Sequence, residues 1–348
     1  MATLLGPPEG ADYQRFVDAI NEGECVPFLG AGANLCGHKP CDWDPLKRDL
    51  LPLGSQLAGW LANEFHYPPG QSEITCECHH AQHLVAEKME DLLRISQYVV
   101  LEVEKGPLVS RLRRLLDHDY PPTTLHRLLA AIPGHFQARG KRDRHLLVIT
   151  TNYDDLMERA FADAGEPVEV IYYAPVRIEG GSRISGSFVH QKQNSERMPL
   201  VGDGSDLSLH SASIVFKIHG TVERNLGENT AGDDTYVITE DDYIEYLTRT
   251  DLVFPAHVIA KLKGSSFLFL GYGLRDWNLR AFLNRIWTEQ AASFKSWAIQ
   301  FNPEKLDARF WQNRGVTVFN EDLSRVVEEL RTRMNITLHA GGAAPAAH

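Results

Sequence analysis

The stretch Leu146-Leu-Val-Ile-Thr-Thr-Asn-Tyr-Asp-Asp155 decides the fold. Its apolar start is too short for a helix and suits a strand that is covered on both faces, as in a parallel sheet. Polar side chains from Thr150 to Asp155 follow directly, and a helical run begins at Leu156. In open α/β sheets, ligands bind beyond the carboxyl ends of the strands, so these side chains are a candidate site. A helix cap is the alternative, because Asn and Asp commonly begin helices.

Four more apolar segments also end in glycine or in a polar residue. They are Cys25–Leu29, followed by Gly30, Ala31, Gly32 and Asn34; Ile214–Ile218, followed by His219; Ser266–Leu270, followed by Gly271, Tyr272 and Gly273; and Ser296–Phe301, followed by Asn302. Helical runs separate most of these segments, which predicts an α/β fold with a Rossmann-like parallel sheet and helices on both faces. The glycines suit either a tight turn or backbone amides that face a phosphate. Capping alone does not explain five such endings.

We expect a single Rossmann-like domain over residues 1–340, with a mainly helical insertion at 44–118 and a disordered tail at 341–348. The insertion contains amphipathic stretches, and the tail has nothing to bury. Residues 177–213 are rich in Gly, Ser and charge, which indicates a long excursion, either a mobile lid or a disordered loop.

Composition excludes several classes of protein. The formal charge of -11 disfavours direct nucleic-acid binding, which needs a basic face. No apolar run approaches the roughly 20 residues of a membrane helix, and the amino terminus does not resemble a signal peptide. Five cysteines indicate free thiols in a reducing compartment, so we expect a cytoplasmic protein. Cys76-Glu-Cys78-His79-His80 has the wrong spacing for a zinc ribbon, and we expect no metal.

Taken in order, these motifs resemble the sirtuin superfamily, and within it the sirtuin-like NAD hydrolases of prokaryotic antiphage systems. The matching segments are Gly30–Gly32 with the family's Gly-Ala-Gly, Thr150–Asp154 with Thr-Gln-Asn-Ile-Asp, His219-Gly220 with the catalytic His-Gly, Gly271–Leu274 with Gly-Thr-Ser-Leu, and Asn302 with a ribose-contacting Asn. Thr151 and Gly273 depart from that pattern. The four-cysteine zinc ribbon of the family's protein deacylases is also missing, which puts a peptide groove in doubt.

The resemblance implies roles for individual residues. Asn152 would position a water or the ribose, His219 would act as the base, and Asp154 would orient the nicotinamide or stabilise charge. The implied cofactor-binding residues are Gly30, Ala31, Gly32, Asn34, Thr151, Gly271, Tyr272, Gly273 and Asn302. NAD would be the substrate, and no metal is implied.

The resemblance therefore implies an NAD glycohydrolase that releases nicotinamide and ADP-ribose and defends against phage by depleting NAD. Such an enzyme must be silent at rest, so we expect control by homo-oligomer assembly or by a partner, with a HerA-like ATPase as one candidate. An NAD-dependent protein deacylase is the first alternative. A non-catalytic nucleotide-binding or assembly module is the second.

Overall fold

A nine-stranded sheet forms the centre of the computed structural model, within the part of the chain that the structure describes. The structure describes residues 6–39, 42–67, 91–174, 177–179, 182–184, 186–192, 197–199, 207–222, 224, 236–248, 256–273, 283 and 295–338. In spatial order the strands are β11 (Val316–Asn320), β10 (Ser296–Gln300), β9 (Ser266–Leu270), β1 (Cys25–Leu29), β2 (Leu147–Thr150), β8 (Ser213–Lys217), β3 (Val168–Ala174), β6 (Ser187–Lys192) and β7 (Arg197–Pro199).

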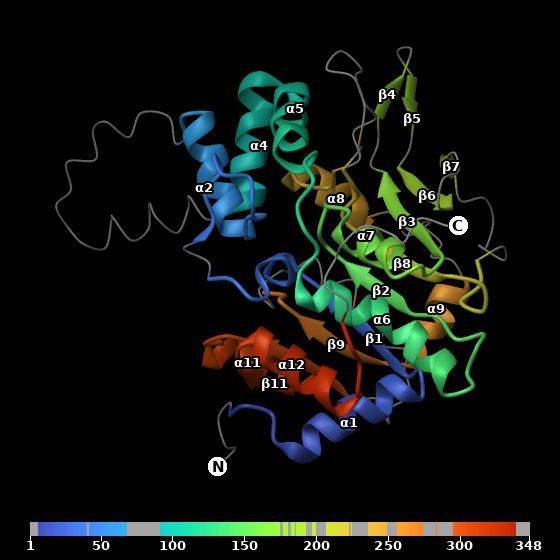
Figure 1. Cartoon of the computed structure of the whole chain (residues 1–348). Helices are drawn as coiled ribbons and strands as arrows, with labels where there is room; N and C mark the ends of the chain where they lie inside the picture. The colour runs from blue at the N-terminus through green and yellow to red at the C-terminus, as the bar shows by residue number, and fades with distance from the viewer. Residues whose placement is uncertain are drawn as a thin grey trace.

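The sheet is parallel from β11 to β3, while β6 and β7 are antiparallel (Figure 1). The prediction of a Rossmann-like α/β fold is confirmed. β1 is joined through helices to β2 on one side, whereas β9, β10 and β11 extend the sheet on its other side. The strand order therefore reverses at the β1/β9 boundary, the place in such sheets where a crevice for ligands opens.

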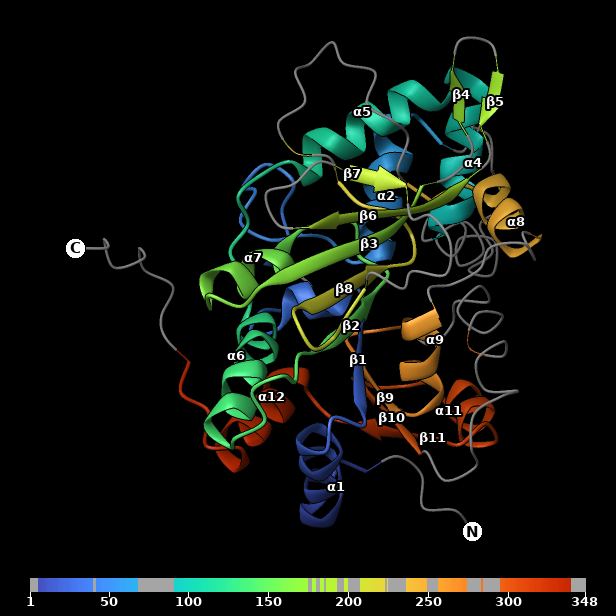
Figure 2. The ribbon, with the colours of Figure 1, turned by 90° about the vertical axis from the view of Figure 1, so that its right-hand side faces the viewer.

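Helices cover both faces of the sheet, because successive residues of each central strand point to opposite sides. In β2, Val148 belongs to one buried apolar cluster and Ile149 to the other. Figure 2 shows the two helical layers on either side of the sheet. The first layer contains α1 (Gly10–Asn21), α6 (Thr124–Ala138), α7 (Leu156–Asp163) and α12 (Leu323–Arg333), and the second contains α8 (Glu240–Thr248), α9 (Ala256–Lys263) and α11 (Lys305–Gln312).

A third apolar cluster lies in the helices between β1 and β2. These are α2 (Gly54–Glu64), α4 (Leu92–Val103) and α5 (Lys105–Leu116), and they pack against one another and against Val222, Tyr236 and Ile238. The mainly helical character of this region is as expected for the described residues. The limits 44–118 and the single-domain division stay predictions.

The alternative of a disordered loop is wrong for the described residues between 177 and 213, and the alternative of a lid stays a prediction. β4 (Arg177–Glu179) and β5 (Ser182–Ile184) pair as a small antiparallel sheet, and β6 pairs antiparallel with β3. Phe188 of β6 is buried against Tyr173 of β3, with ring centroids 5.7 Å apart. These strands are short and lie among Gly and Ser residues, so the composition of the region did not indicate them.

Two further expectations, for the tail at 341–348 and for the Cys76–His80 stretch, lie outside the described residues. In the described ranges, no helix combines the length and the apolar character needed to cross a membrane.

Candidate functional site

Asn152 and His219 emerge from neighbouring strands at the same edge of the sheet. Thr150 of β2 is paired with Lys217 of β8, and the Ile218 amide donates to the Thr150 carbonyl over 3.1 Å. Asn152 and His219 each lie two residues beyond that pair, and both are buried. The structure thus places two residues that are far apart in the sequence just beyond the ends of neighbouring strands.

Three polar side chains form a hydrogen-bonded chain at the ends of β1 and β2, which we call the amide relay. Asn34 Nδ2 donates to Asp154 Oδ2 over 2.7 Å, and Asn152 Nδ2 donates to Asn34 Oδ1 over 3.4 Å and to the Gly30 carbonyl over 3.1 Å. A carboxylate and a carbonyl only accept, so each must face an NH2 group. The Asp154 carboxylate therefore fixes the orientation of the Asn34 amide, and the Gly30 carbonyl fixes that of the Asn152 amide. In this orientation Asn152 Oδ1 points away from Gly30.

The N-cap residue of α7 is Asp155, whose side chain makes no capping hydrogen bond. Asp154, one residue earlier, accepts from the Leu156 amide through Oδ1 over 3.1 Å and from Asn34 through Oδ2. Its carboxylate therefore contacts both the start of α7 and the amide relay.

The first turn of α6 lies beside the amide relay. Thr123 Oγ1 bonds to the Ala33 carbonyl at 3.0 Å and lies 2.8 Å from His126 Nδ1. Burial lowers the pKa of His126 to about 4, although the nearby Asp154 carboxylate acts in the opposite direction. His126 is therefore a neutral structural residue at pH 7.

Lys217 is a functional candidate that the sequence analysis missed. Its side chain is fully buried, and Nζ donates to the carbonyls of Tyr153 at 3.3 Å and Asp154 at 2.5 Å. Its third partner is Glu158 Oε1 at 2.8 Å. Burial raises the pKa of Glu158, and Lys217 opposes that rise. The ammonium group thus holds the turn that carries Asn152 and Asp154. A lysine inside the apolar run Ile214–Ile218 was the signal for it.

The loops after β1 and β9 contact each other through glycines. A Cβ on Gly30 would lie 2.7 Å from the Gly271 oxygen, and one on Gly271, whose φ is +64°, would lie 2.2 Å from the Ala33 nitrogen. The amide of Gly32 donates to the Gly271 carbonyl over 2.8 Å, and the amide of Gly30 donates to Leu270 over 3.2 Å. These two amides already have acceptors, so the expected contact with a phosphate is not available to them as they stand. A Cβ on Gly273 would meet nothing within 4 Å.

The remaining predicted cofactor residues occupy varied positions. The Tyr272 ring is buried edge-on against Phe28, with centroids 5.2 Å apart, so it packs in the core. Ala31 begins the short 3-10 helix η1 (Ala31–Leu35), and the Thr151 amide donates to the Leu29 carbonyl over 3.2 Å. Asn302 is exposed at the end of β10, which β9 and β1 separate from β2. The structure joins Asn34, Asn152 and Asp154 by hydrogen bonds at the ends of β1 and β2. His219 follows the neighbouring strand β8, and Asn302 lies farther along the sheet.

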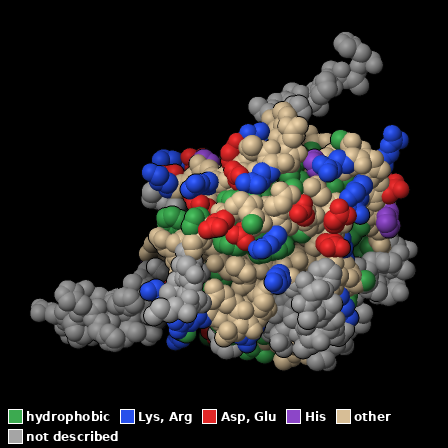
Figure 3. Space-filling model, turned by 90° about the horizontal axis from the view of Figure 1, so that it is seen from below, with side chains coloured by type: hydrophobic (Ala, Val, Ile, Leu, Met, Phe, Trp, Pro, Cys, Tyr) green, Lys and Arg blue, Asp and Glu red, His purple; other side chains and the backbone are tan. Residues whose placement is uncertain are grey.

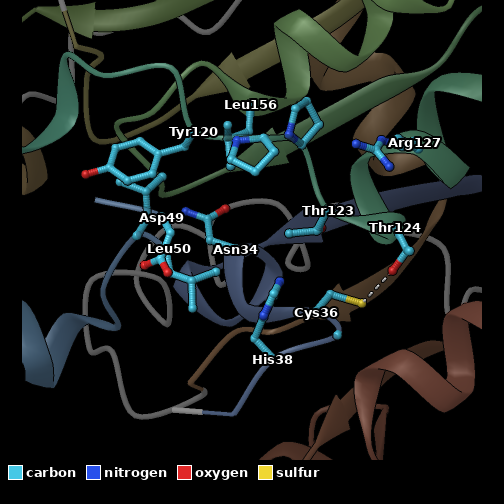
Figure 4. A pocket seen from close by; sticks show the side chains of 14 residues that line it. Asn34, Cys36, His38, Asp49, Leu50, Tyr120, Thr123, Thr124, Arg127 and Leu156 are labelled. Carbon is cyan, nitrogen blue, oxygen red and sulfur yellow. Dashed lines mark hydrogen bonds between the residues drawn. The ribbon is translucent and has the colours of Figure 1, made fainter. Parts of the chain in front are cut away.

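A pocket of about 310 Å³ opens beside the amide relay. Figure 4 shows Asn34 at its centre, with Thr123, Thr124 and Arg127 of α6 on one side and Asp49 and Tyr120 on the other. A second pocket of about 800 Å³ shares His38, Asp49, Leu50 and Pro121 with the first. Asn152 and His219 do not line either pocket. Asn34 lines the first pocket, so it is the residue through which that pocket contacts the amide relay. The sequence analysis missed His38, Asp49 and Arg127, since none of them follows a strand.

The described residues contain no group of three or more His, Cys, Asp or Glu side chains arranged to hold a metal ion. Of the five cysteines, Cys25 and Cys36 are buried free thiols in β1 and just after η1. Three cysteines are then left, which is too few for a four-cysteine zinc ribbon.

A parallel sheet with a reversal point and a polar cluster beyond the strand ends defines a Rossmann-like α/β protein, a fold in which ligands bind at this edge of the sheet. The chain belongs to the SIR2-like domain family, whose profile matches residues 146–319, half of its length. The resemblance drawn from the motifs is confirmed at the level of the family.

Named relatives extend this similarity over more of the chain. Defense-associated sirtuin 2 of Bacillus subtilis is 24% identical over 317 residues, which cover 88% of this chain and 24% of that protein. The NAD(+) hydrolase ThsA of Enterococcus faecium is 23% identical over 275 residues, covering 78% of this chain and 42% of ThsA. The ThsA of Acinetobacter baumannii is 26% identical over 276 residues, covering 78% and 41%. The chain thus spans less than half the length of these relatives.

Proposed function

We propose that this protein is an NAD+ hydrolase that cleaves the bond between nicotinamide and ribose, releasing nicotinamide and ADP-ribose. The observation that supports the proposal is the Thr150–Lys217 pairing, because Asn152 and His219 each follow that pair by two residues at the same edge of the sheet as the amide relay. The similarity to the NAD(+) hydrolases ThsA supports the same activity.

The chemistry of this bond suits the side chains present. Nicotinamide leaves as a neutral molecule from a cationic substrate, so no general acid is needed, while positive charge develops on the ribose. The relay directs Asn152 Oδ1 away from Gly30, where a carbonyl oxygen can accept from a ribose hydroxyl or from the attacking water. The negative charge of Asp154, one amide away, favours the cationic transition state, and His219 takes up the proton.

A hydrolase fits the cysteines better than the alternative deacylase does. Protein deacylases of the superfamily use a four-cysteine ribbon to help hold the acyl-lysine peptide, and Cys25 and Cys36 are committed to the core. We propose water, rather than an acylated lysine, as the acceptor of the ribosyl group.

We propose further that NAD depletion is an antiphage response and takes place in the cytoplasm. The name of Defense-associated sirtuin 2 supports the defence role. We also propose that assembly into a homo-oligomer, or contact with a HerA-like ATPase, activates the enzyme. Direct nucleic-acid binding is not proposed, because acidic and basic side chains are mixed over the face seen in Figure 3 and the formal charge is -11.

The test is nicotinamide release from NAD by the purified protein, with and without the protein encoded beside it in the genome. We expect release by the wild type and by Asn63→Ala, a surface control, and none by Asn152→Ala or His219→Ala. An acetyl-lysine peptide that turns the product into O-acetyl-ADP-ribose would instead identify a deacylase. NAD that binds and stays intact under both conditions would indicate a binding module.

A further inference from the structure

Tyr243 of α8 contacts the candidate base directly. Its hydroxyl lies 3.1 Å from His219 Nδ1 and 3.4 Å from Nε2, and the two rings meet edge-on with centroids 5.0 Å apart. Both side chains are buried. A hydrogen bond to one ring nitrogen of a histidine sets which nitrogen carries the proton, and so which one can act as a base.

The start of α8 is fixed by a capping box formed by Thr239 and Asp242. The Asp242 amide donates to Thr239 Oγ1 over 3.1 Å, and the Thr239 amide donates to Asp242 Oδ2 over 3.1 Å. This box sets the direction in which the first turn of α8 presents Tyr243 to His219.

The helical insertion is bonded to the two residues that precede Tyr243. Lys105 at the start of α5 forms an ion pair with Asp242 Oδ1 at 2.7 Å, and both side chains are largely buried. Gln97 of α4 donates to Asp241 Oδ2 over 2.9 Å and accepts from the Asp241 amide over 3.1 Å. Figures 1 and 2 both show α8 beside these helices. Three consecutive residues of α8 therefore connect the insertion to the candidate base.

We propose that Tyr243 is a positioning residue for His219, and that α4 and α5 hold it in place through Asp241 and Asp242. Tyr243 accepts from the Nδ1–H of His219, which leaves Nε2 with the lone pair that takes the proton. The role of His219 as base rests on the proposed function, whereas the contact between the two side chains does not. A partner protein that binds the helical insertion would affect catalysis through Asp241, Asp242 and Tyr243.

The first test compares Tyr243→Phe with Tyr246→Phe, the same change on the same helix in a residue of the apolar cluster. We expect Tyr243→Phe to lower kcat for nicotinamide release by about tenfold with little change in KM, as for loss of part of an acid–base contribution. We expect Tyr246→Phe to keep the wild-type kcat.

Nitrogen-15 NMR of protein labelled at histidine separates this inference from the proposed function. The His219 signals, assigned by their loss in His219→Ala, are expected to show an Nδ1–H tautomer in the wild type and to shift in Tyr243→Phe but not in Tyr246→Phe. Unchanged His219 signals in Tyr243→Phe would overturn the inference whatever the activity. A wild type that leaves NAD intact, yet shows the shift, would instead refute the hydrolase.

The link to the insertion is tested by Lys105→Met, with Arg111→Met as its control. Arg111 lies on the same helix and pairs with Glu64 at 3.4 Å. We expect Lys105→Met to lower kcat several-fold in the wild-type background and to have no added effect in Tyr243→Phe, since changes in one network are not additive. Equal effects in both backgrounds would show that the insertion does not act through Tyr243.

Discussion

At the scale of single residues, the amide relay gives Asn34 two partners that the sequence did not predict. Its amide donates to Asp154 and accepts from Asn152, so it joins the carboxylate to the amide that we propose acts on the substrate. Nothing in the run Gly30–Leu35 indicates these partners, because Asp154 lies 120 positions away in the chain. The sequence placed Asn34 in the site by its proximity to the glycines.

Replacing Asn34 by alanine should therefore impair turnover while the fold survives. Asn152 would lose one of its two acceptors, and a misplaced catalytic group can cost about a hundredfold in rate. We expect kcat for nicotinamide release to fall by about that factor, with Asn63→Ala as the unaffected control. A wild-type kcat in Asn34→Ala would show that Gly30 alone orients Asn152.

His126 should make the fold sensitive to acid. Its pKa is lowered in the folded state to about 4, so between its ordinary value of about 6.5 and pH 4 the unfolded chain binds more protons. The stabilisation contributed by neutral His126 is full above pH 6.5 and is lost as the pH falls toward 4. At pH 5 the loss is about 2 kcal/mol.

Urea denaturation at pH 7 and pH 5 measures this effect, with His126→Gln as the comparison. Glutamine keeps a polar side chain at the third position of the helix and does not titrate. We expect the free energy of unfolding to fall by about 2 kcal/mol more in the wild type than in the variant. Equal losses of unfolding free energy in the wild type and in His126→Gln would show that a group other than His126 causes the acid sensitivity.

At the scale of elements, the contact between the loops after β1 and β9 governs stability at the reversal point of the sheet. The sequence showed glycines after both strands, but not that β1 and β9 are neighbours, since pairing across the whole chain leaves no local pattern. The sequence left open whether the glycines form tight turns or face a phosphate with their amides. In the structure, Gly30, Gly32 and Gly271 allow two backbones to touch.

Gly271→Ala and Gly273→Ala should therefore differ sharply. A Cβ at Gly271 meets backbone at a positive φ, whereas one at Gly273 meets open space. We expect the first variant to lose about 3 kcal/mol of unfolding free energy and the second less than about 0.5. Equal urea midpoints for the two variants would contradict the described loop contact.

The apolar strands and their polar endings could be predicted because each is a local pattern of burial. Lys217 and Tyr243 could not be assigned roles in this way. Lys217 stands out inside an apolar run. Two of its acceptors, however, are the backbone carbonyls of Tyr153 and Asp154 in the turn after β2, which no local pattern indicates. Tyr243 and Tyr246 both lie in α8, and only the folded structure shows that Tyr243 contacts His219.

At the scale of the whole molecule, the chain has two apolar clusters on the faces of its sheet and a third in the helical insertion. The third cluster is contributed largely by α2, α4 and α5, so we expect the insertion to open as a unit of its own. Leu112 is fully buried in it, whereas Leu101 of α4 is 75% exposed.

Leu112→Ala should cost about 3 kcal/mol, the usual loss for a buried leucine, and Leu101→Ala almost nothing. In native-state hydrogen exchange, we expect faster exchange in the three insertion helices of Leu112→Ala and unchanged protection in β1 and β2. Equal acceleration in β2 would show one cooperative unit instead.

The most direct measurement of the central claim is a crystal structure of Asn152→Ala with uncleaved NAD. The account predicts that the nicotinamide riboside lies over the ends of β2 and β8, with His219 on one side of its ribose and Asn34 and Asp154 on the other. A riboside bound elsewhere, with His219 out of reach of the ribose, would contradict it.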